Sequence, residues 1–314
     1  MVGVTGVAFA LLLAQPAVEY ELAGRIEPAG RAAVYVQAAT DPFSTSTLAD
    51  ASGRFRVGRL APGSYTVAVF LPARGEARQT IEVGPGTADS RRRVSITVKI
   101  EDARLDRDAR QGTVSRHQLA IPETARREFG EAQKLVARHD VPGAVKRLER
   151  AVELAPAFAE AWNNLGTIAY QTRRLARAEE CFRTALEADP SAYDPLVNLG
   201  GVLVTEMKLD EALKYNVFAV LARPNDALAN SQLGLTYFHL RRPDLAEKYL
   251  VETVRLDPAH FSYPQLVLAE IHVRRGERAK AADDLEDFLR RHPDWHAATR
   301  MREAIRSLRA AAAP

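Results

Sequence analysis

The sequence predicts a multidomain protein in which a small all-β sandwich is followed by an all-α solenoid of helical hairpins, wound as a right-handed superhelix. Two observations predict this fold class. Between residues 18 and 100, apolar residues alternate with polar ones at the period of a β-strand, and turn residues separate the runs. From residue 125 onward, a proline recurs at a nearly constant spacing behind each amphipathic stretch.

Residues 1–17 form an apolar run, MVGVTGVAFALLLAQPA. It is too short to cross a bilayer as a helix but has the length of a signal-peptide core. We expect an export signal, cleaved after Ala14 or Ala17, although no basic residue precedes Arg25. An upstream start, a weak signal and a buried first strand are the alternatives. The single cysteine, Cys181, has no thiol to pair with inside the chain, and we expect it to be a packed side chain.

Residues 18–100 are predicted to form the β-sandwich. Six alternating runs indicate strands: YELAGRI, AVYVQA, GRFRVGRL, SYTVAVF, ARQTIEV and RVSITVKI. The apolar positions expected to face the core are Phe55, Val57, Tyr65, Val67, Val69, Ile81, Val83, Val94, Ile96 and Val98. Pro62 and Gly63 suit a tight turn, because proline presets the first corner and glycine accepts the second.

One part of this region resembles carboxypeptidase regulatory-like domains, also called transthyretin-like. The matching run, D-x-x-G-x-F-x-V-x-x-L-x-P-G-x-Y-x-V, is made by Asp50, Gly53, Phe55, Val57, Leu60, Pro62, Gly63, Tyr65 and Val67. The resemblance implies a small accessory sandwich without catalysis of its own, of a kind common in bacterial envelope and secreted proteins. Residues 101–124 are mixed in charge and are expected to be a linker, with a helix starting after Pro122.

Residues 125–294 are predicted to form five helical hairpins, in units 125–158, 159–192, 193–226, 227–261 and 262–294, with a capping helix over 295–310. Prolines spaced 34, 34, 34 and 35 residues apart close the units at Pro156, Pro190, Pro224, Pro258 and Pro293. Twelve residues before each proline stands an alanine, at Ala144, Ala178, Ala212, Ala246 and Ala281. The prolines and the alanines therefore indicate the same repeat independently of each other.

The second unit resembles the tetratricopeptide repeat closely. Its landmark residues are Trp162, Leu165, Gly166, Ala178, Phe182, Ala185 and Pro190. The third and fourth units keep most of these positions, and the outer units depart from them, as expected where one side of a repeat faces solvent. A small residue at the crossing of the two helices, such as Gly166, lets their backbones approach.

The resemblance implies that a ligand would lie in the concave groove formed by the first helix of each unit. The positions carried over are Asn163, Asn164, Thr167, Tyr170, Val197, Asn198, Gly201, Val204, Ser231, Gln232, Leu235, Phe238 and His239. We expect the amides of Asn164, Asn198 and Gln232 to bind the backbone of an extended peptide, with inter-helix packing as the alternative. The Lys and Arg positions that clamp a carboxyl terminus in some family members are occupied here by Asn163, Leu228 and Gln232.

The repeat frame also aligns basic residues at the end of the first helix of successive units. This basic edge consists of Arg173, Arg174, Lys208, Arg241, Arg242, Arg274 and Arg275. Cations there oppose the helix dipole and bind terminal carbonyl groups. An anionic partner is the second interpretation.

Charge and motifs narrow the function. The formal net charge is +3, and residues 123–314 carry 28 basic and 28 acidic residues, so the solenoid is a poor candidate for binding nucleic acid. No catalytic elbow, zinc motif or phosphate loop is present in the sequence, and we expect no enzyme activity, cofactor or metal. His292 and His296 are four residues apart, but Pro293 interrupts a helical metal pair.

The sequence therefore predicts a non-enzymatic adaptor that binds a protein or peptide in the solenoid groove, in the periplasm or cell envelope of a bacterium. The alternatives are a polysaccharide- or surface-polymer-binding envelope protein that uses the β-sandwich, and a cytosolic assembly scaffold if residues 1–17 are retained. We expect no transmembrane span. The partner, the pathway and the oligomeric state are not specified by the sequence.

Overall fold

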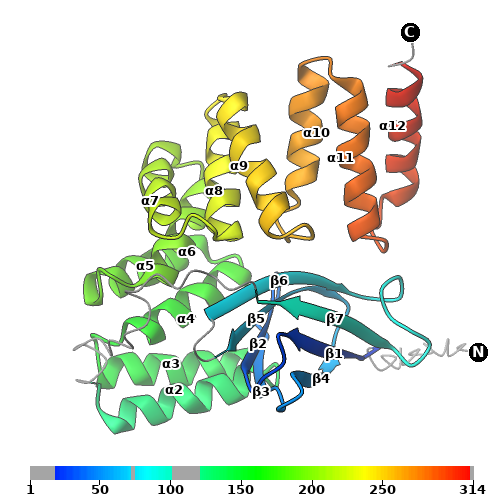
Figure 1. The fold of residues 1–314 in the computed structure, drawn as a ribbon. Coiled ribbons are helices and arrows are strands. Elements are labelled where there is room, and N and C mark those ends of the chain that lie inside the picture. The colour runs from blue at the N-terminus through cyan, green and yellow to red at the C-terminus, as the bar shows by residue number, and fades with distance from the viewer. Residues whose placement is uncertain (1–17, 72–74, 101–120, 312–314) are drawn as a thin grey trace, which may run out of the picture.

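The computed structural model describes residues 18–71, 75–100 and 121–311. The expected export signal at 1–17 and nearly all of the expected linker lie outside the described residues. Seven described strands form a sandwich of two sheets (Figure 1). The three-stranded sheet has the order β4-β1-β7, from strands Arg54–Leu60, Tyr20–Glu27 and Arg93–Lys99. The four-stranded sheet has the order β3-β2-β5-β6, from strands Ser44–Leu48, Ala33–Ala38, Gly63–Leu71 and Gly75–Val83.

The inner faces of the two sheets form one apolar core, as the alternating pattern predicts. All the predicted inward residues are buried there except Ile96, which is partly buried. One strand, β3, was not predicted, because its sequence STSTL has no apolar alternation and it lies at the edge of its sheet. The strands β6 and β7 are also edge strands, each in a different sheet.

Five helical hairpins and a last single helix follow the sandwich (Figure 1). The first helices of the hairpins are α2 (Glu123–Val136), α4 (Ala159–Gln171), α6 (Tyr193–Thr205), α8 (Ala227–His239) and α10 (Pro264–Arg274). The second helices are α3 (Val141–Leu154), α5 (Leu175–Ala188), α7 (Leu209–Ala222), α9 (Pro243–Leu256) and α11 (Arg278–Arg291). The single helix, α12 (Ala298–Ala310), packs on α11 at the end of the solenoid. Among the described residues, no helix combines the length and the apolar character that a membrane crossing requires.

Glycine is needed where the two helices of a hairpin cross. A Cβ atom added to Gly166 would lie 2.6 Å from the ring of Phe182, and one added to Gly234 would lie 2.8 Å from Leu250. Gly200 faces Asn216 in the same way. Residues 182, 216 and 250 occupy one repeat position, so three hairpins use the same close approach.

Each hairpin turn is closed by the same backbone motif. The first helix ends on a left-handed residue, which is His139, Arg173, Met207, Arg241 or Gly276 in successive units. The following amide donates to a carbonyl of the last helical turn, as from Arg174 to Ala169 at 2.8 Å and from Lys208 to Leu203 at 2.9 Å. This is the Schellman end of a helix.

The solenoid bends around the sandwich rather than extending away from it (Figure 1). At one end, α2 packs beside β3, and Phe43 stacks on His139 in the turn between α2 and α3 with 4.6 Å between ring centres. At the other end, the loops that follow α9 and α11 reach β6 and the turn after it. The solenoid therefore contacts the four-stranded sheet at its two edge strands, β3 and β6.

Candidate protein-binding surfaces

The predicted groove lies on the first helices of units two to four. Residues three, four and seven apart on α4, α6 and α8 share one face of each helix, which places the predicted positions in a row. Tyr170 is 37% exposed, and Thr205 on the next unit is also exposed. Their hydroxyl groups are 3.3 Å apart, so the two residues form one accessible polar spot across units two and three.

The groove amides are largely used inside the solenoid. The Asn198 amide donates to the side-chain oxygen of Asn163 at 3.0 Å, which links α6 to α4. Gln232 is buried against the backbone of Gly200 and Gly201. Asn164 is half-buried. A hydrogen bond between repeats accounts for the Asn198 amide, whereas Gln232 packs between repeats with its side-chain oxygen unpartnered among the described residues.

The apolar groove positions also pack between repeats. Val197 and Val204 are buried, and Leu235 packs on the cluster that contains Val204. Phe238 packs on the cluster of Leu250 and Leu268, and its ring lies 5.3 Å from the guanidinium carbon of Arg274.

The remaining predicted positions have internal partners. Ser231 is buried and its hydroxyl bonds Ser262 at 2.6 Å. Thr167 donates to the carbonyl of Asn163 at 3.0 Å. His239 lies edge-on to the ring of Phe238.

The basic edge is partly neutralised by neighbouring carboxylates. Lys208 pairs with Glu179 at 2.7 Å and with Glu206 at 2.8 Å, and these contacts raise the pKa of its amine. Arg275 pairs with Asp244 and Glu247, both at 2.5 Å, and Arg274 pairs with Glu270. Arg173 and Arg241 occupy the left-handed positions that end α4 and α8. Arg174 and Arg242 lie next to them and are exposed.

The sandwich occupies one end of the groove face. Gln171, the last residue of α4, lies on that face and donates its amide to the carbonyl of Ala38 at 3.1 Å. A partner bound along this face would therefore meet the sandwich beside Tyr170.

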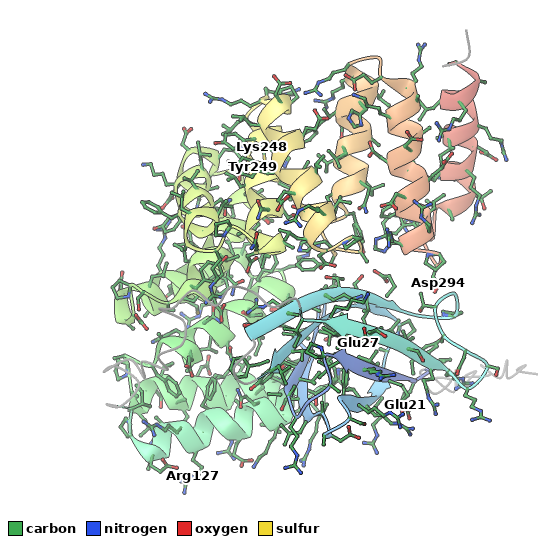
Figure 2. The ribbon with its side chains drawn as sticks, in the orientation of Figure 1. Glu21, Glu27, Arg127, Lys248, Tyr249 and Asp294 are labelled. Atoms are coloured by element: carbon green, nitrogen blue, oxygen red, sulfur yellow. The ribbon has the colours of Figure 1, made fainter. Side chains whose placement is uncertain are left out.

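Three side chains from the loops between repeats hold β6. The Asp257 carboxylate accepts the Thr80 amide at 3.0 and 3.1 Å and the Thr80 hydroxyl at 2.5 Å. The Asp294 carboxylate accepts the Gly86 amide at 2.9 and 2.8 Å, and Figure 2 shows it beside the turn after β6. His292 is buried, and its Nδ1 lies 3.0 Å from Glu82.

The sequence did not predict this junction. Neither Asp257 nor Gly86 belongs to a sequence motif that indicates a contact between the two modules. The contact between Thr80 and Asp257 spans 177 positions of the sequence, and the contact between Gly86 and Asp294 spans 208. Contacts between residues this far apart leave no local pattern in the sequence. Burial raises the pKa of the Asp257 carboxyl, and the hydrogen bonds from Thr80 oppose this rise.

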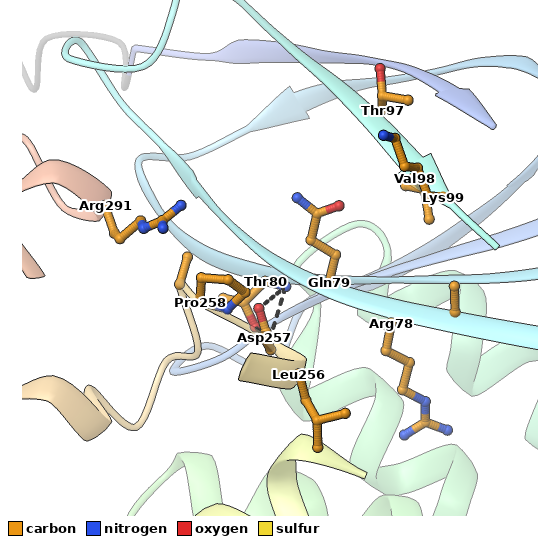
Figure 3. Close-up of a pocket in the computed structure, with 12 residues that line it drawn as sticks. Arg78, Gln79, Thr80, Thr97, Val98, Lys99, Leu256, Asp257, Pro258 and Arg291 are labelled. Atoms are coloured by element: carbon orange, nitrogen blue, oxygen red, sulfur yellow. Dashed lines mark hydrogen bonds between the residues drawn. The ribbon is translucent and has the colours of Figure 1, made fainter. Parts of the chain in front are cut away.

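A pocket of about 300 Å³ lies at this junction (Figure 3). Its walls come from β6, β7, the end of α9 and the end of α11. Three basic residues line it, namely Arg78, Lys99 and Arg291. Among the described residues that line the pocket, Asp257 is the acidic one. Its carboxylate oxygens already accept hydrogen bonds from Thr80.

Comparison with known families identifies both modules. Residues 23–99 match the carboxypeptidase regulatory-like domain, and residues 129–193 and 227–260 match the tetratricopeptide repeat. The chain therefore carries a carboxypeptidase regulatory-like domain followed by tetratricopeptide repeats, as the sequence predicted.

Two curated proteins are similar to the chain over part of their length. Anaphase-promoting complex subunit 7 of Arabidopsis thaliana is 26% identical over 179 residues, which is 56% of this chain and 31% of that protein. Anaphase-promoting complex subunit CDC16 of Saccharomyces cerevisiae is 29% identical over 149 residues, which is 46% of this chain and 18% of that protein. The chain thus spans less than a third of either relative.

Solved structures share the solenoid fold. PilW, described as a type IV pilus biogenesis factor, has a TM-score of 0.52 at 21% identity and covers 60% of this chain and 92% of its own. MamA of Desulfovibrio magneticus has a TM-score of 0.50 at 21% identity and covers 56% of this chain and 99% of its own. At this identity the likeness shows the fold alone.

Proposed function

Because the chain joins a regulatory-like sandwich to a tetratricopeptide solenoid, we propose that it is a non-enzymatic adaptor that binds a protein or peptide partner on the concave face of its repeats. The observation that carries this proposal is the accessible pair Tyr170 and Thr205, which spans two repeats on that face. A stacked-repeat solenoid offers a long continuous surface of this kind.

The proposed contacts with the partner involve fewer residues than the sequence predicted. Since Asn198 and Gln232 are used between repeats, the proposed contacts are Tyr170, Thr205 and the half-buried Asn164. Tyrosine supplies both apolar area and a hydroxyl group, which makes it a common anchor in protein interfaces.

The test is capture of a partner by purified full-length protein, with and without the double substitution Tyr170→Ala and Thr205→Arg. Both side chains are accessible, so we expect the variant to stay folded and to lose at least about tenfold in affinity for the partner. The matched control changes Phe218→Ala and Leu221→Arg, which are exposed on α7, a second helix of the hairpins. Equal loss in both variants, or no loss in the groove variant, contradicts the proposal.

We also propose that the protein acts outside the cytoplasm of a bacterium, in the periplasm or envelope. The support is the signal-like composition of residues 1–17. Fractionation of the host and sequencing of the protein's amino terminus test this location. A mature chain that begins near residue 15 or 18 in the envelope fraction supports it, and a cytosolic chain that retains residues 1–17 contradicts it.

A second candidate function is binding of an envelope polysaccharide by the sandwich. Tyr35 on β2 is 54% exposed and Phe70 on β5 is 50% exposed, on one face of the four-stranded sheet. Pairing of Tyr35 with Ala68 and of Ala33 with Phe70 makes the two rings diagonal neighbours, so together they offer a flat apolar surface. If this candidate is right, titration with host polysaccharide gives a binding signal that Tyr35→Ala removes and Tyr170→Ala does not.

A further inference from the structure

The junction pocket adjoins the open edges of two sheets. β6 ends the four-stranded sheet and β7 ends the three-stranded sheet. In an antiparallel ladder, every second residue of an edge strand directs its backbone groups away from the sheet. Thr80 has this orientation, because its amide bonds Asp257 instead of β5. Arg78 and Glu82, two residues away on either side, therefore direct their backbone groups the same way.

This edge already binds carboxylates. The Asp257 carboxylate takes the place of a neighbouring strand at Thr80, and the Asp294 carboxylate accepts the Gly86 amide in the turn that follows β6. Both acids come from loops of the solenoid, which therefore covers two points: first the β6 edge at Thr80, and then the turn at Gly86. The backbone at Arg78 lies beyond the first point and borders the pocket.

The charge of the pocket favours an anionic occupant. Arg78 pairs with Glu76 at 2.5 Å and is also attracted by Asp194 and Asp226, whereas Arg291 has a long contact of 3.4 Å with Asp287. Among the described residues, no carboxylate pairs with Lys99. Gln79 and Thr97 add hydrogen-bonding groups to the same walls, as Figure 3 shows. A volume of about 300 Å³ holds a few residues of extended chain.

We propose that the junction pocket binds an extended acidic peptide segment of a protein partner. The segment adds to the free edge of β6 beside Arg78, and its carboxylates pair with Lys99 and with Arg291 on the two sides of the pocket. Main-chain hydrogen bonds to an edge strand supply affinity in this mode, and side-chain pockets supply specificity. This surface is separate from the groove around Tyr170, so each can be tested without the other.

The probe is a short capped peptide of alternating glutamate and valine with a fluorescent label, titrated into the full-length protein. We expect saturable binding that weakens at high salt, and binding at least about tenfold weaker for the same peptide with glutamine in place of glutamate. A peptide with N-methyl groups on alternate amides is also expected to bind at least about tenfold more weakly, because strand addition needs those donors.

Two protein variants test the site itself. Lys99→Glu with Arg291→Glu is expected to reduce binding of the acidic peptide at least about tenfold. Two control variants are expected to leave binding of the acidic peptide unchanged. Lys214→Glu reverses a charge on the exposed face of α7, and Tyr170→Ala changes the groove. Absence of binding, equal binding of the glutamine peptide, or equal binding by the double variant overturns the acidic pocket. Equal binding of the N-methylated peptide overturns strand addition.

Discussion

Glycine at the helix crossing determines how closely the two helices of each hairpin approach. Gly166 lies against Phe182 with no room for a methyl group, whereas Gly130 on α2 has nothing within 4 Å of its missing Cβ. Glycine is therefore required by close packing at position 166 and is not required by packing at position 130.

The first prediction compares these two glycines. Gly166→Ala is expected to lower the free energy of unfolding by about 1–3 kcal/mol, because overpacking displaces Phe182. Gly130→Ala is expected to raise it by about 0.5–1 kcal/mol, since alanine favours a helix interior. Urea unfolding followed by circular dichroism measures both values. Equal effects of the two substitutions would contradict the close crossing.

A second prediction concerns His260, a buried residue between α9 and α10. Burial lowers the pKa of its imidazole to about 3, and its Nδ1 accepts the Ser262 amide at 3.3 Å, so it is neutral in the folded protein. The unfolded chain binds a proton below about pH 6.5. The difference in proton binding at His260 therefore contributes its full share to the free energy of unfolding above about pH 6.5. This contribution is lost as the pH falls from about 6.5 towards 3.

The variant His260→Gln isolates this contribution. Between about pH 7 and pH 5, the native protein is expected to lose about 2 kcal/mol more of its unfolding free energy than the variant. Denaturant titrations at a series of pH values give the comparison. Parallel pH profiles would show that His260 does not become buried and neutral on folding.

At the scale of the element, the hairpin turns repeat one backbone motif with different residues. His139, Arg173, Met207 and Arg241 adopt left-handed conformations that a side chain disfavours, and only the fifth unit uses glycine there, at Gly276. The basic residues at two of these positions were predicted as an edge that binds terminal carbonyls, but the carbonyls are bonded by backbone amides.

Met207→Gly is expected to stabilise the third hairpin. Met207 is exposed, so little packing is lost, and relief of the left-handed strain is expected to raise the free energy of unfolding by about 0.5–1 kcal/mol after the entropy of glycine is counted. Thermal unfolding measures the change. Met207→Ala keeps the Cβ atom and serves as the control, and stabilisation by both substitutions would refute strain as the cause.

Much of the fold follows from the sequence because its signals are local and periodic. The 34-residue frame of prolines and alanines gave the hairpins, and alternation gave six of the described strands. The polar strand β3 was missed, since edge position and not apolar alternation defines it. The groove positions were located by the repeat frame, but their hydrogen bonds to each other, as between Asn198 and Asn163, depend on how neighbouring repeats stack.

The solenoid as a whole holds the sandwich through contacts at both of its ends. Buried Asp257 and exposed Asp294 each bond a backbone amide of the sandwich, and Phe43 stacks on His139 at the other end. A partner on the concave face therefore meets both modules. The sandwich therefore borders the concave face on which we propose that the partner binds.

Asp257→Ala tests this docking. The substitution leaves the Thr80 amide and hydroxyl without their carboxylate, which costs about 1–3 kcal/mol for each buried group that stays unpaired. We expect faster hydrogen exchange along β6 in the variant. Asp189→Ala is the matched control, because Asp189 also precedes a repeat proline but its carboxylate accepts hydrogen bonds from Ser191, two residues away in the same loop. Unchanged exchange in β6 would contradict the docked arrangement.

The most direct test of the adaptor function is photo-crosslinking in the native host, with a photoreactive phenylalanine analogue at position 170 on the concave face. We expect a covalent adduct with one protein partner from position 170, and no such adduct from position 218 on the opposite face. Adducts from position 218 alone, or none from position 170, would contradict binding of a protein partner on the concave face of the repeats.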